Sequence, residues 1–289
     1  MNTQDQFVDN PASVKRIILC ADDYGQSAAI SAGILQLVEQ RRLSAVSCLT
    51  ESDFWTHSGN ALLEHREQID IGLHFNLTHA FPSSPFPALP LNRVMGLALS
   101  GRIDRVQIVK TLQTQLDRFE NIAKQIPDFV DGHQHVHVLP GIRHIVVGEL
   151  EQRYGQKKPY LRAVNPRLST RGDFIKELVL KLLGIGFEDL AQRHGMRTNP
   201  GFAGIYSLQP QADFAGLMQR WISAADNGDL LMCHPGARFT NHSDCHASDN
   251  SDPIAATRPR ELAFLLSDEF AALLSRNAIR LSRFCDIQR

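Results

Sequence analysis

Residues 17–25 read IILCADDYG, an apolar run that passes directly into two adjacent carboxylates and a glycine. The run has the composition of a buried β-strand, and the next residues, QSAAISAGILQLVEQRR (26–42), carry apolar side chains at helical spacing. A strand followed by a helix is the repeating unit of parallel α/β folds, whose reactive residues lie at the carboxyl ends of strands. Aspartates also occur in ordinary turns and helix caps, so Asp22 and Asp23 need support from the rest of the chain.

The same alternation continues to the end of the sequence. Strands are expected at 16–21, 44–50, 69–78, 128–138, 160–165, 201–208, 229–236 and 279–284, and helices at 27–41, 105–125, 142–154, 174–194 and 259–275. Parallel strands covered by helices are therefore expected, either closed into a barrel or doubly wound. Two stretches, 80–96 and 237–259, interrupt the pattern and are expected to be long loops. Without a repeat or a linker, residues 1–289 are interpreted as a single domain, with 1–15 as a polar N-terminal extension.

Composition excludes several classes of function. The 289 residues are 43% hydrophobic, and 30 Lys and Arg against 31 Asp and Glu give a net charge of -1, so no global field attracts nucleic acid. No apolar run approaches the roughly 20 residues of a membrane span, and the first residues lack a signal-peptide core. The five cysteines form no CxxC pair and are expected to be reduced. A cytoplasmic protein is predicted, with monomer and homodimer both left open.

Polar side chains gather where the expected strands end. They are Asp22 and Asp23 on the first strand, His74 and Asn76 on the third, Asp131, His133, His135 and His137 on the fourth, Arg162 on the fifth and His234 on the seventh. A single histidine beside a strand usually has a structural role. Five strands that deliver acids, imidazoles and a guanidinium to the same face of a parallel fold instead indicate a functional site.

Carboxylate and imidazole donors without paired thiolates suit a divalent cation, either zinc or a harder ion such as magnesium or manganese. One Asp and two His would leave room for a water and a substrate oxygen, and a cation lowers the pKa of such a water, so hydrolysis is expected. Alternate residues of a strand lie about 6.6–6.8 Å apart, so only one of His133, His135 and His137 is expected to bind the ion. The roles of the other two are left open.

Successive side chains of a strand point to opposite faces, so Asp22 and Asp23 share a cavity only if the chain turns beside them. Gly25 is the residue expected to mark that turn, since glycine adopts conformations that other residues avoid. One carboxylate could then bind the cation while the other accepts a proton from water.

Four motifs carry a resemblance to a known family. They are ADDYG (21–25), GLHFNLT (72–78), DGHQHVHVLP (131–140) and CHPG (233–236). In this order they resemble the YdjC/ChbG family of carbohydrate deacetylases, including its hopanoid-associated HpnK branch, from about residue 16 to residue 284. The resemblance implies an α/β fold, a distorted TIM-like (β/α) barrel related to polysaccharide deacetylases, with one divalent metal ion such as Mg²⁺ or Zn²⁺.

The same resemblance implies roles for individual residues. The metal ligands of the family correspond to Asp23, His74 and His133. Its catalytic base corresponds to Asp22, its general acid to His234, and an arginine close to the substrate or to the catalytic groups to Arg162. The implied reaction removes the N-acetyl group from an amino sugar, in an oligosaccharide or a glycolipid, and releases acetate.

Two other classes of function are left open. A phosphoesterase or amidohydrolase could use the same scaffold, but a phosphoesterase should show a second metal about 3.5–4 Å from the first or a basic clamp. A non-catalytic metal-binding or sugar-binding module should have lost a catalytic group, whereas Asp22 and His234 are both present.

Overall fold

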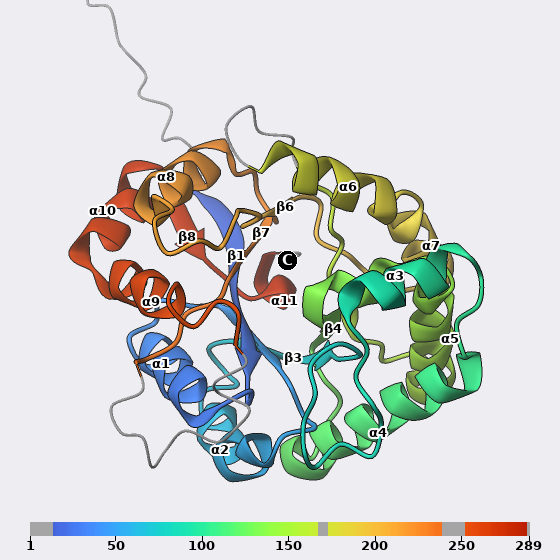
Figure 1. The fold of residues 1–289 in the computed structure, drawn as a ribbon. Coiled ribbons are helices and arrows are strands. Elements are labelled where there is room, and N and C mark those ends of the chain that lie inside the picture. Colours follow the sequence, from blue (N-terminus) through green and yellow to red (C-terminus); the bar gives the residue numbers. More distant parts are fainter. Residues whose placement is uncertain (1–13, 167–172, 239–251, 288–289) are drawn as a thin grey trace, which may run out of the picture.

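The computed structural model describes residues 14–166, 173–238 and 252–287 (Figure 1). Its strands are β1 (Lys15–Tyr24), β2 (Ala45–Cys48), β3 (Asp70–Phe75), β4 (Phe129–Gly132), β5 (Tyr160–Leu161), β6 (Phe202–Ala203), β7 (Leu230–Cys233) and β8 (Ile279–Leu281). They pair in parallel in the order β5-β4-β3-β2-β1-β7-β6, and β8 pairs with the start of β1. Each strand lies within or overlaps a predicted segment, which confirms the predicted α/β alternation.

The sheet curls until its two edge strands approach each other. Isolated parallel bridges join Leu161 to Thr198 and Pro166 to Phe202, so the segments around β5 and β6 nearly close the ring. Helices surround the strands on the outside (Figure 1). The fold is therefore the expected distorted (β/α) barrel, and the distortion lies where β5 and β6 are only two residues long each.

The helices are α1 (Ala28–Glu39), α2 (Asp53–Leu63), α3 (Leu91–Leu99), α4 (Arg105–Ala123), α5 (Ile142–Tyr154), α6 (Phe174–Gly184), α7 (Phe187–Arg193), α8 (Phe214–Ala224), α9 (Arg258–Leu266), α10 (Asp268–Arg276) and α11 (Phe284–Ile287). The single helices predicted over 174–194 and 259–275 are each two helices. Gly186, with φ of 75°, separates α6 from α7, and the Ser267 hydroxyl accepts from the Phe270 N–H to begin α10. Helices α2, α3, α8 and α11 lie outside the predicted helices, and α3 begins inside the stretch expected to be a loop.

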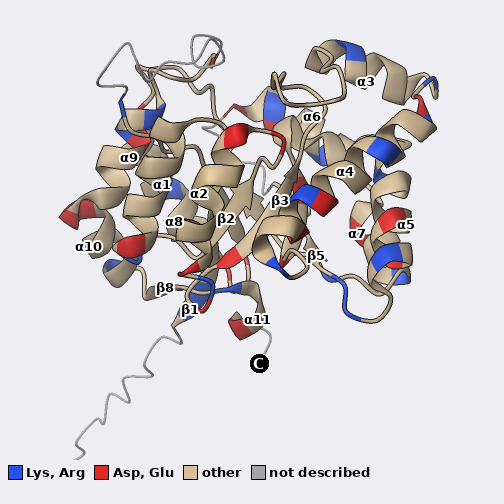
Figure 2. Cartoon of the chain, turned by 90° about the horizontal axis from the view of Figure 1, so that it is seen from below, with Lys and Arg blue, Asp and Glu red and all other residues tan. Residues whose placement is uncertain are grey.

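Charged side chains are intermixed on the surface rather than segregated. In the view of Figure 2, Lys and Arg alternate with Asp and Glu over the outer helices. The net charge of -1 therefore comes from interspersed charges of both signs. In the part of the chain that the structure describes, no helix combines the length and apolarity needed to cross a membrane.

The predicted strand over 128–138 is wrong after its first half. Strand β4 ends at Gly132, and Gln134 and His135 have left-handed backbones with φ of 52° and 60°. Residues His133–Val138 therefore form tight turns instead of an extended strand. Consequently the spacing argument for alternate histidines of a strand does not apply to His133, His135 and His137.

A buried carboxyl group at the start of β3 makes stability depend on pH. The Asp70 carboxylate accepts from the Phe284 N–H at 2.7 Å and the Tyr160 hydroxyl at 3.3 Å. Burial nevertheless raises the pKa of Asp70 to about 7, and nearby Asp128 adds to the shift. Because this folded-state pKa exceeds the unfolded value of about 3.9, stability is lost as the pH rises from about 4 through 7.

Asp70→Asn is therefore expected to stabilise the protein at pH 8 by up to about 4 kcal/mol, with a smaller gain at pH 5. Asparagine keeps an oxygen acceptor for both hydrogen bonds but never has to ionise. Urea unfolding of both proteins at the two pH values measures the difference. A gain that does not grow with pH would contradict the raised pKa.

Candidate active site

Strand β1 directs two adjacent carboxylates into one cavity because its backbone turns at Asp23. This residue has φ of 72°, in the left-handed region, and the β1–β2 register shifts between Ala21 and Tyr24. The turn expected at Gly25 thus occurs two residues earlier. Asp22 and Asp23 are 2% and 1% exposed and line a cavity of about 400 Å³.

Three of the residues predicted as metal ligands lie together in that cavity. The Asp23 Oδ1 atom is 3.4 Å from His74 Nε2 and 3.1 Å from His133 Nδ1. One donor atom from each residue lies within 4.8 Å of the other two. His74 comes from β3 and His133 directly follows β4, so the carboxyl ends of three strands supply the cluster.

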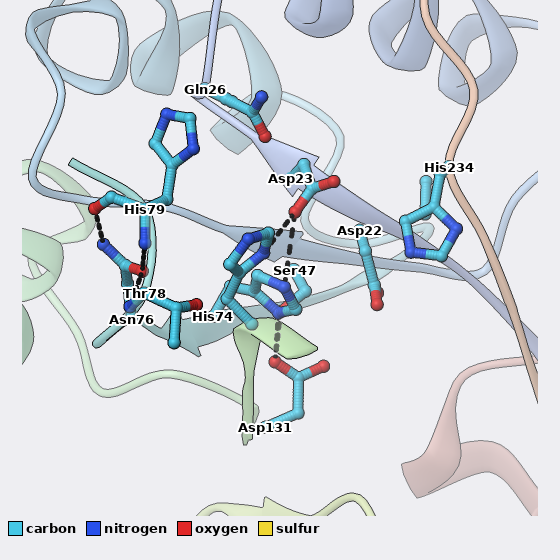
Figure 3. A network of polar contacts seen from close by, with 12 residues as sticks. Asp22, Asp23, Gln26, Ser47, His74, Asn76, Thr78, His79, Asp131 and His234 are labelled. Carbon is cyan, nitrogen blue, oxygen red and sulfur yellow. Dashed lines mark hydrogen bonds and ion pairs between the residues drawn. The ribbon is translucent and has the colours of Figure 1, made fainter. Parts of the chain in front are cut away.

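The surroundings of His74 fit a divalent cation. Its Nδ1 atom lies 2.6 Å from Asp131 Oδ1, which also accepts a hydrogen bond from the Ser47 hydroxyl at 2.6 Å (Figure 3). Because a carboxylate only accepts, Nδ1 carries a proton, so in the neutral form of the ring Nε2 is the nitrogen with a lone pair for a cation. A carboxylate behind a ligating imidazole is the usual arrangement in metal sites.

The carboxylates around His74 also favour a proton on its ring. Burial alone would lower the pKa of His74, but the negative charges of Asp131 and Asp22 raise it to about 10. The neutral ring needed for metal binding is thus disfavoured until a cation compensates the carboxylates. Binding of a metal ion should therefore release protons.

Arg162 is fully buried and joins two carboxylates of the site. Its NH1 and NH2 donate to the two Asp22 oxygens at 2.7 and 2.6 Å, and NH2 lies 2.5 Å from Asp131 Oδ2. Burial would raise the pKa of Asp22, but the charge and hydrogen bonds of Arg162 hold it well below its usual value. This geometry favours the orienting role among the two expected for Arg162.

A second group of potential metal donors surrounds the same guanidinium. Cys20, Asp22 and Asp131 have donor atoms within 4.8 Å of one another. Arg162 NH2 donates to Cys20 Sγ at 3.0 Å as well as contacting both carboxylates. The positive charge that this group requires is thus already supplied by the protein, and burial raises the pKa of the Cys20 thiol.

Arg258, at the start of α9, contacts the other oxygen of the candidate ligand. Its NH2 donates to Asp23 Oδ2 at 2.8 Å, while its Nε donates to Asp252 Oδ2 at 2.6 Å. Arg258 thereby leaves Asp23 Oδ1 facing the two imidazoles. Arg258 has no signal in the sequence, because it lies 235 positions from Asp23 and outside the four motifs.

His234 follows β7 and lines the same cavity. Its backbone N–H donates to Glu261 Oε2 at 2.6 Å, and the Tyr206 hydroxyl hydrogen-bonds the other oxygen of Glu261. The His234 Nδ1 atom is buried and has no hydrogen-bond partner among the described residues. In Figure 3 its ring lies beside Asp22.

The other two histidines of the DGHQHVH segment occupy different surroundings. His137 is fully buried, and its Nε2 donates to the Arg162 carbonyl oxygen at 2.8 Å. Burial lowers the pKa of His137 to about 4, so the ring is neutral. His135 lines the cavity and packs edge-on against Phe202, with ring centroids 5.5 Å apart. His137 therefore supports the backbone that carries Arg162, while His135 lines the cavity that also contains Asp23, His74 and His133.

His133→Ala is expected to weaken divalent-cation binding at least about tenfold, whereas His137→Ala should leave the affinity nearly unchanged. The reason is that His133 presents a nitrogen to Asp23, whereas His137 donates to the Arg162 carbonyl oxygen. Calorimetric titration with Zn²⁺, with circular dichroism as a check on folding, measures the difference. Equal affinities in two folded variants would rule out His133 as a ligand.

Comparison with known proteins relates this chain to one family. The family model described as YdjC-like protein matches residues 16–276. A carbohydrate deacetylase of Mus musculus is 27% identical over 94% of both chains. A chitooligosaccharide deacetylase of Yersinia pestis is 25% identical over 94% of this chain and 99% of its own.

A solved structure from Enterococcus faecalis, described as a candidate cellobiose-phosphate cleavage protein, has a similar fold. It superimposes with a TM-score of 0.68 at 19% identity, and covers 95% of this chain and 99% of its own. At this identity the likeness concerns the fold alone.

Proposed function

This chain belongs to the YdjC-like protein family, and we propose that it is a metal-dependent carbohydrate deacetylase. It would hydrolyse the N-acetyl group of an acetylated amino sugar, in an oligosaccharide or a glycolipid, and release acetate. Relatives that align over nearly the whole chain are named carbohydrate and chitooligosaccharide deacetylases. The observation that carries the proposal is the cavity in which Asp22 and His234 lie with the donor set of Asp23, His74 and His133.

Asp23, His74 and His133 would hold the cation. When bound, a divalent ion would act as a Lewis acid, polarising the acetamide carbonyl and favouring ionisation of a nearby water. Of the two candidate ions, Zn²⁺ suits a donor set with two imidazoles better than Mg²⁺, which prefers oxygen donors. Asp131 and Arg258 would keep the donor atoms in place. Asp131 contacts the second ring nitrogen of His74, and Arg258 donates to the second carboxylate oxygen of Asp23.

Asp22 is proposed to accept the proton of the attacking water. Arg162 keeps the carboxylate ionised and fixes both of its oxygens. The remaining lone pairs of those oxygens can accept a proton from the water. A carboxylate whose oxygen binds a cation could not offer that lone pair in the same way. A low pKa makes Asp22 a weak base, so its contribution depends mainly on orientation.

His234 is proposed to protonate the departing amine. Its side chain lines the cavity and its Nδ1 atom has no partner in the described part of the chain, so the ring is available to a substrate. An amine leaves readily only once it is protonated, and imidazole is suited to deliver that proton near neutral pH.

His234→Ala is expected to retain the cation but to lower amide hydrolysis by roughly 10²-fold. The loss should be smaller for an activated acetate ester, because its leaving group needs no proton. Rates on N-acetylglucosamine oligomers and on 4-nitrophenyl acetate provide the comparison. Equal losses on amide and ester would argue against this role.

The test of the proposed function is an acetate-release screen with the Zn²⁺- or Mg²⁺-loaded protein. Chitooligosaccharides, other N-acetylhexosamine conjugates and N-acetylated glycolipids form the panel, with phosphate esters as the comparison class. Acetate from at least one amino sugar is expected. No acetate from the panel, or phosphate release instead, would refute the proposal. The structure gives one reason not to expect phosphate release: Arg162 is paired with Asp22 and Asp131, so it is not free to bind a phosphate group.

A further inference from the structure

A small apolar pocket lies beside the catalytic cavity, between α4 and the segment that contains α3. Its volume is about 110 Å³, and its wall includes side chains of Phe86, Leu89, Val94, Leu97, Ile103 and Ile108. The proposed catalytic residues do not line it. The pocket is therefore separate from the proposed catalytic residues.

The pocket and the catalytic cavity adjoin at His79, which lines both. Its ring centroid lies 6.0 Å from that of His133 and 4.6 Å from that of Phe81. His133 is therefore one side chain away from the pocket.

The position of His79 is fixed by its neighbour Asn76. The Asn76 side chain accepts from the His79 N–H at 2.8 Å and donates to the His79 carbonyl at 2.7 Å (Figure 3). Its amide nitrogen also donates to Glu51 Oε2 at 2.8 Å. The residue at which the two cavities adjoin is therefore held by a network of hydrogen bonds.

Most polar atoms around the pocket already have partners. The Glu51 carboxylate accepts from Asn76, Gln115 and Ser84. The Nε2 atoms of Gln107 and His79 are buried and have no hydrogen-bond partner within the described ranges. The pocket thus offers a carbon surface with one free amide donor and one free imidazole nitrogen, which suits an apolar group that carries a hydrogen-bond acceptor.

We propose that the pocket is a second subsite for the substrate, occupied by an apolar group of about four to six heavy atoms. An apolar cavity of about 150 Å³ holds a benzene molecule, so this smaller pocket takes a short chain. The inference rests on the proposed function, since the group is carried by the amino sugar. Its source is either an N-acyl chain longer than acetyl or the group attached at the anomeric oxygen.

Two substrate series distinguish the sources. One compares N-acetyl with N-butanoyl on methyl glucosaminide, and the other compares methyl with butyl glycosides of N-acetylglucosamine. The longer member of one series is expected to have a kcat/KM roughly tenfold higher or more. No gain in either series would overturn the subsite.

Binding supplies a readout that does not need catalysis. Calorimetry should show that butyl glucosaminide, or N-butanoyl glucosamine if the acyl series shows the gain, binds roughly tenfold more tightly than its short counterpart. Failure of every compound to release a carboxylic acid would contradict the proposed function, and this binding difference would still decide the subsite.

A pair of variants on α3 tests the location. Leu97→Phe fills the pocket, and Leu99→Phe makes the same change at a position 62% exposed on the same helix. Leu97→Phe should abolish the preference for the longer compound in rate and in binding. Leu99→Phe should keep the preference. Retention of the preference in Leu97→Phe, or equal loss in both variants, would overturn the assignment.

Discussion

Replacing Asp22 by asparagine is expected to lower turnover roughly 10²–10⁴-fold without loss of the bound cation. Asparagine has nearly the same size and keeps one oxygen for a hydrogen bond from Arg162, but it cannot take a proton from water. Turnover of the best amino-sugar substrate and metal content of the same sample measure the two effects. The acid limb of the wild-type pH profile should not originate in Asp22, because Arg162 holds the pKa of this carboxyl well below its usual value.

Asp23→Asn is the matched control, since it makes the same change one residue along β1. It should weaken cation binding, because Asp23 Oδ1 faces both imidazoles. Excess cation should therefore restore part of its activity and none of that of Asp22→Asn. If added cation brought Asp22→Asn close to the wild-type rate, Asp22 would be a ligand rather than a base.

Arg162→Met should destabilise the protein by about 3–5 kcal/mol at neutral pH. Methionine approximates the arginine stem, but the change leaves Asp22 and Asp131 buried without their shared cation. Arg162 lowers the pKa of Asp22, so the stability that this pairing contributes is present above the unfolded pKa of about 3.9. The cost of the substitution should therefore shrink as the pH falls below about 4.

Arg153→Met is the comparison on the surface. Arg153 pairs with Asp117 at 2.6 Å and Glu120 at 2.8 Å, but its side chain is 26% exposed, and surface ion pairs contribute about 0–1 kcal/mol. Urea unfolding of both variants at pH 7 gives the comparison. Similar losses of unfolding free energy for Arg162→Met and Arg153→Met would show that the buried Arg162 ion pairs contribute no more stability than the surface pairs of Arg153.

Much of the site could be predicted because parallel strands bring their carboxyl ends to one edge of the barrel. That rule alone gathers Asp22, Asp23, His74, Arg162 and His234 from four strands. It uses only the order of strands and loops, which apolar runs reveal well.

Local backbone geometry and distant partners could not be predicted. The left-handed conformation of Asp23 and the turns after Gly132 are unusual for non-glycine residues and depend on tertiary contacts. Arg258 reaches Asp23 from the far end of the chain. Helix α3 could not be predicted because the prolines that precede it are typical of a loop, and the loop was expected to extend over the start of the helix.

The central place of β1 has a consequence for synthesis of the chain. Two of its three partner strands, β7 and β8, begin only at Leu230 and Ile279. Until the ribosome has released them, an apolar strand has one edge of unpaired backbone, which is the kind of edge that recruits strands from other molecules. A nascent chain that ends before Leu230 would thus be the form most exposed to aggregation and most dependent on chaperones.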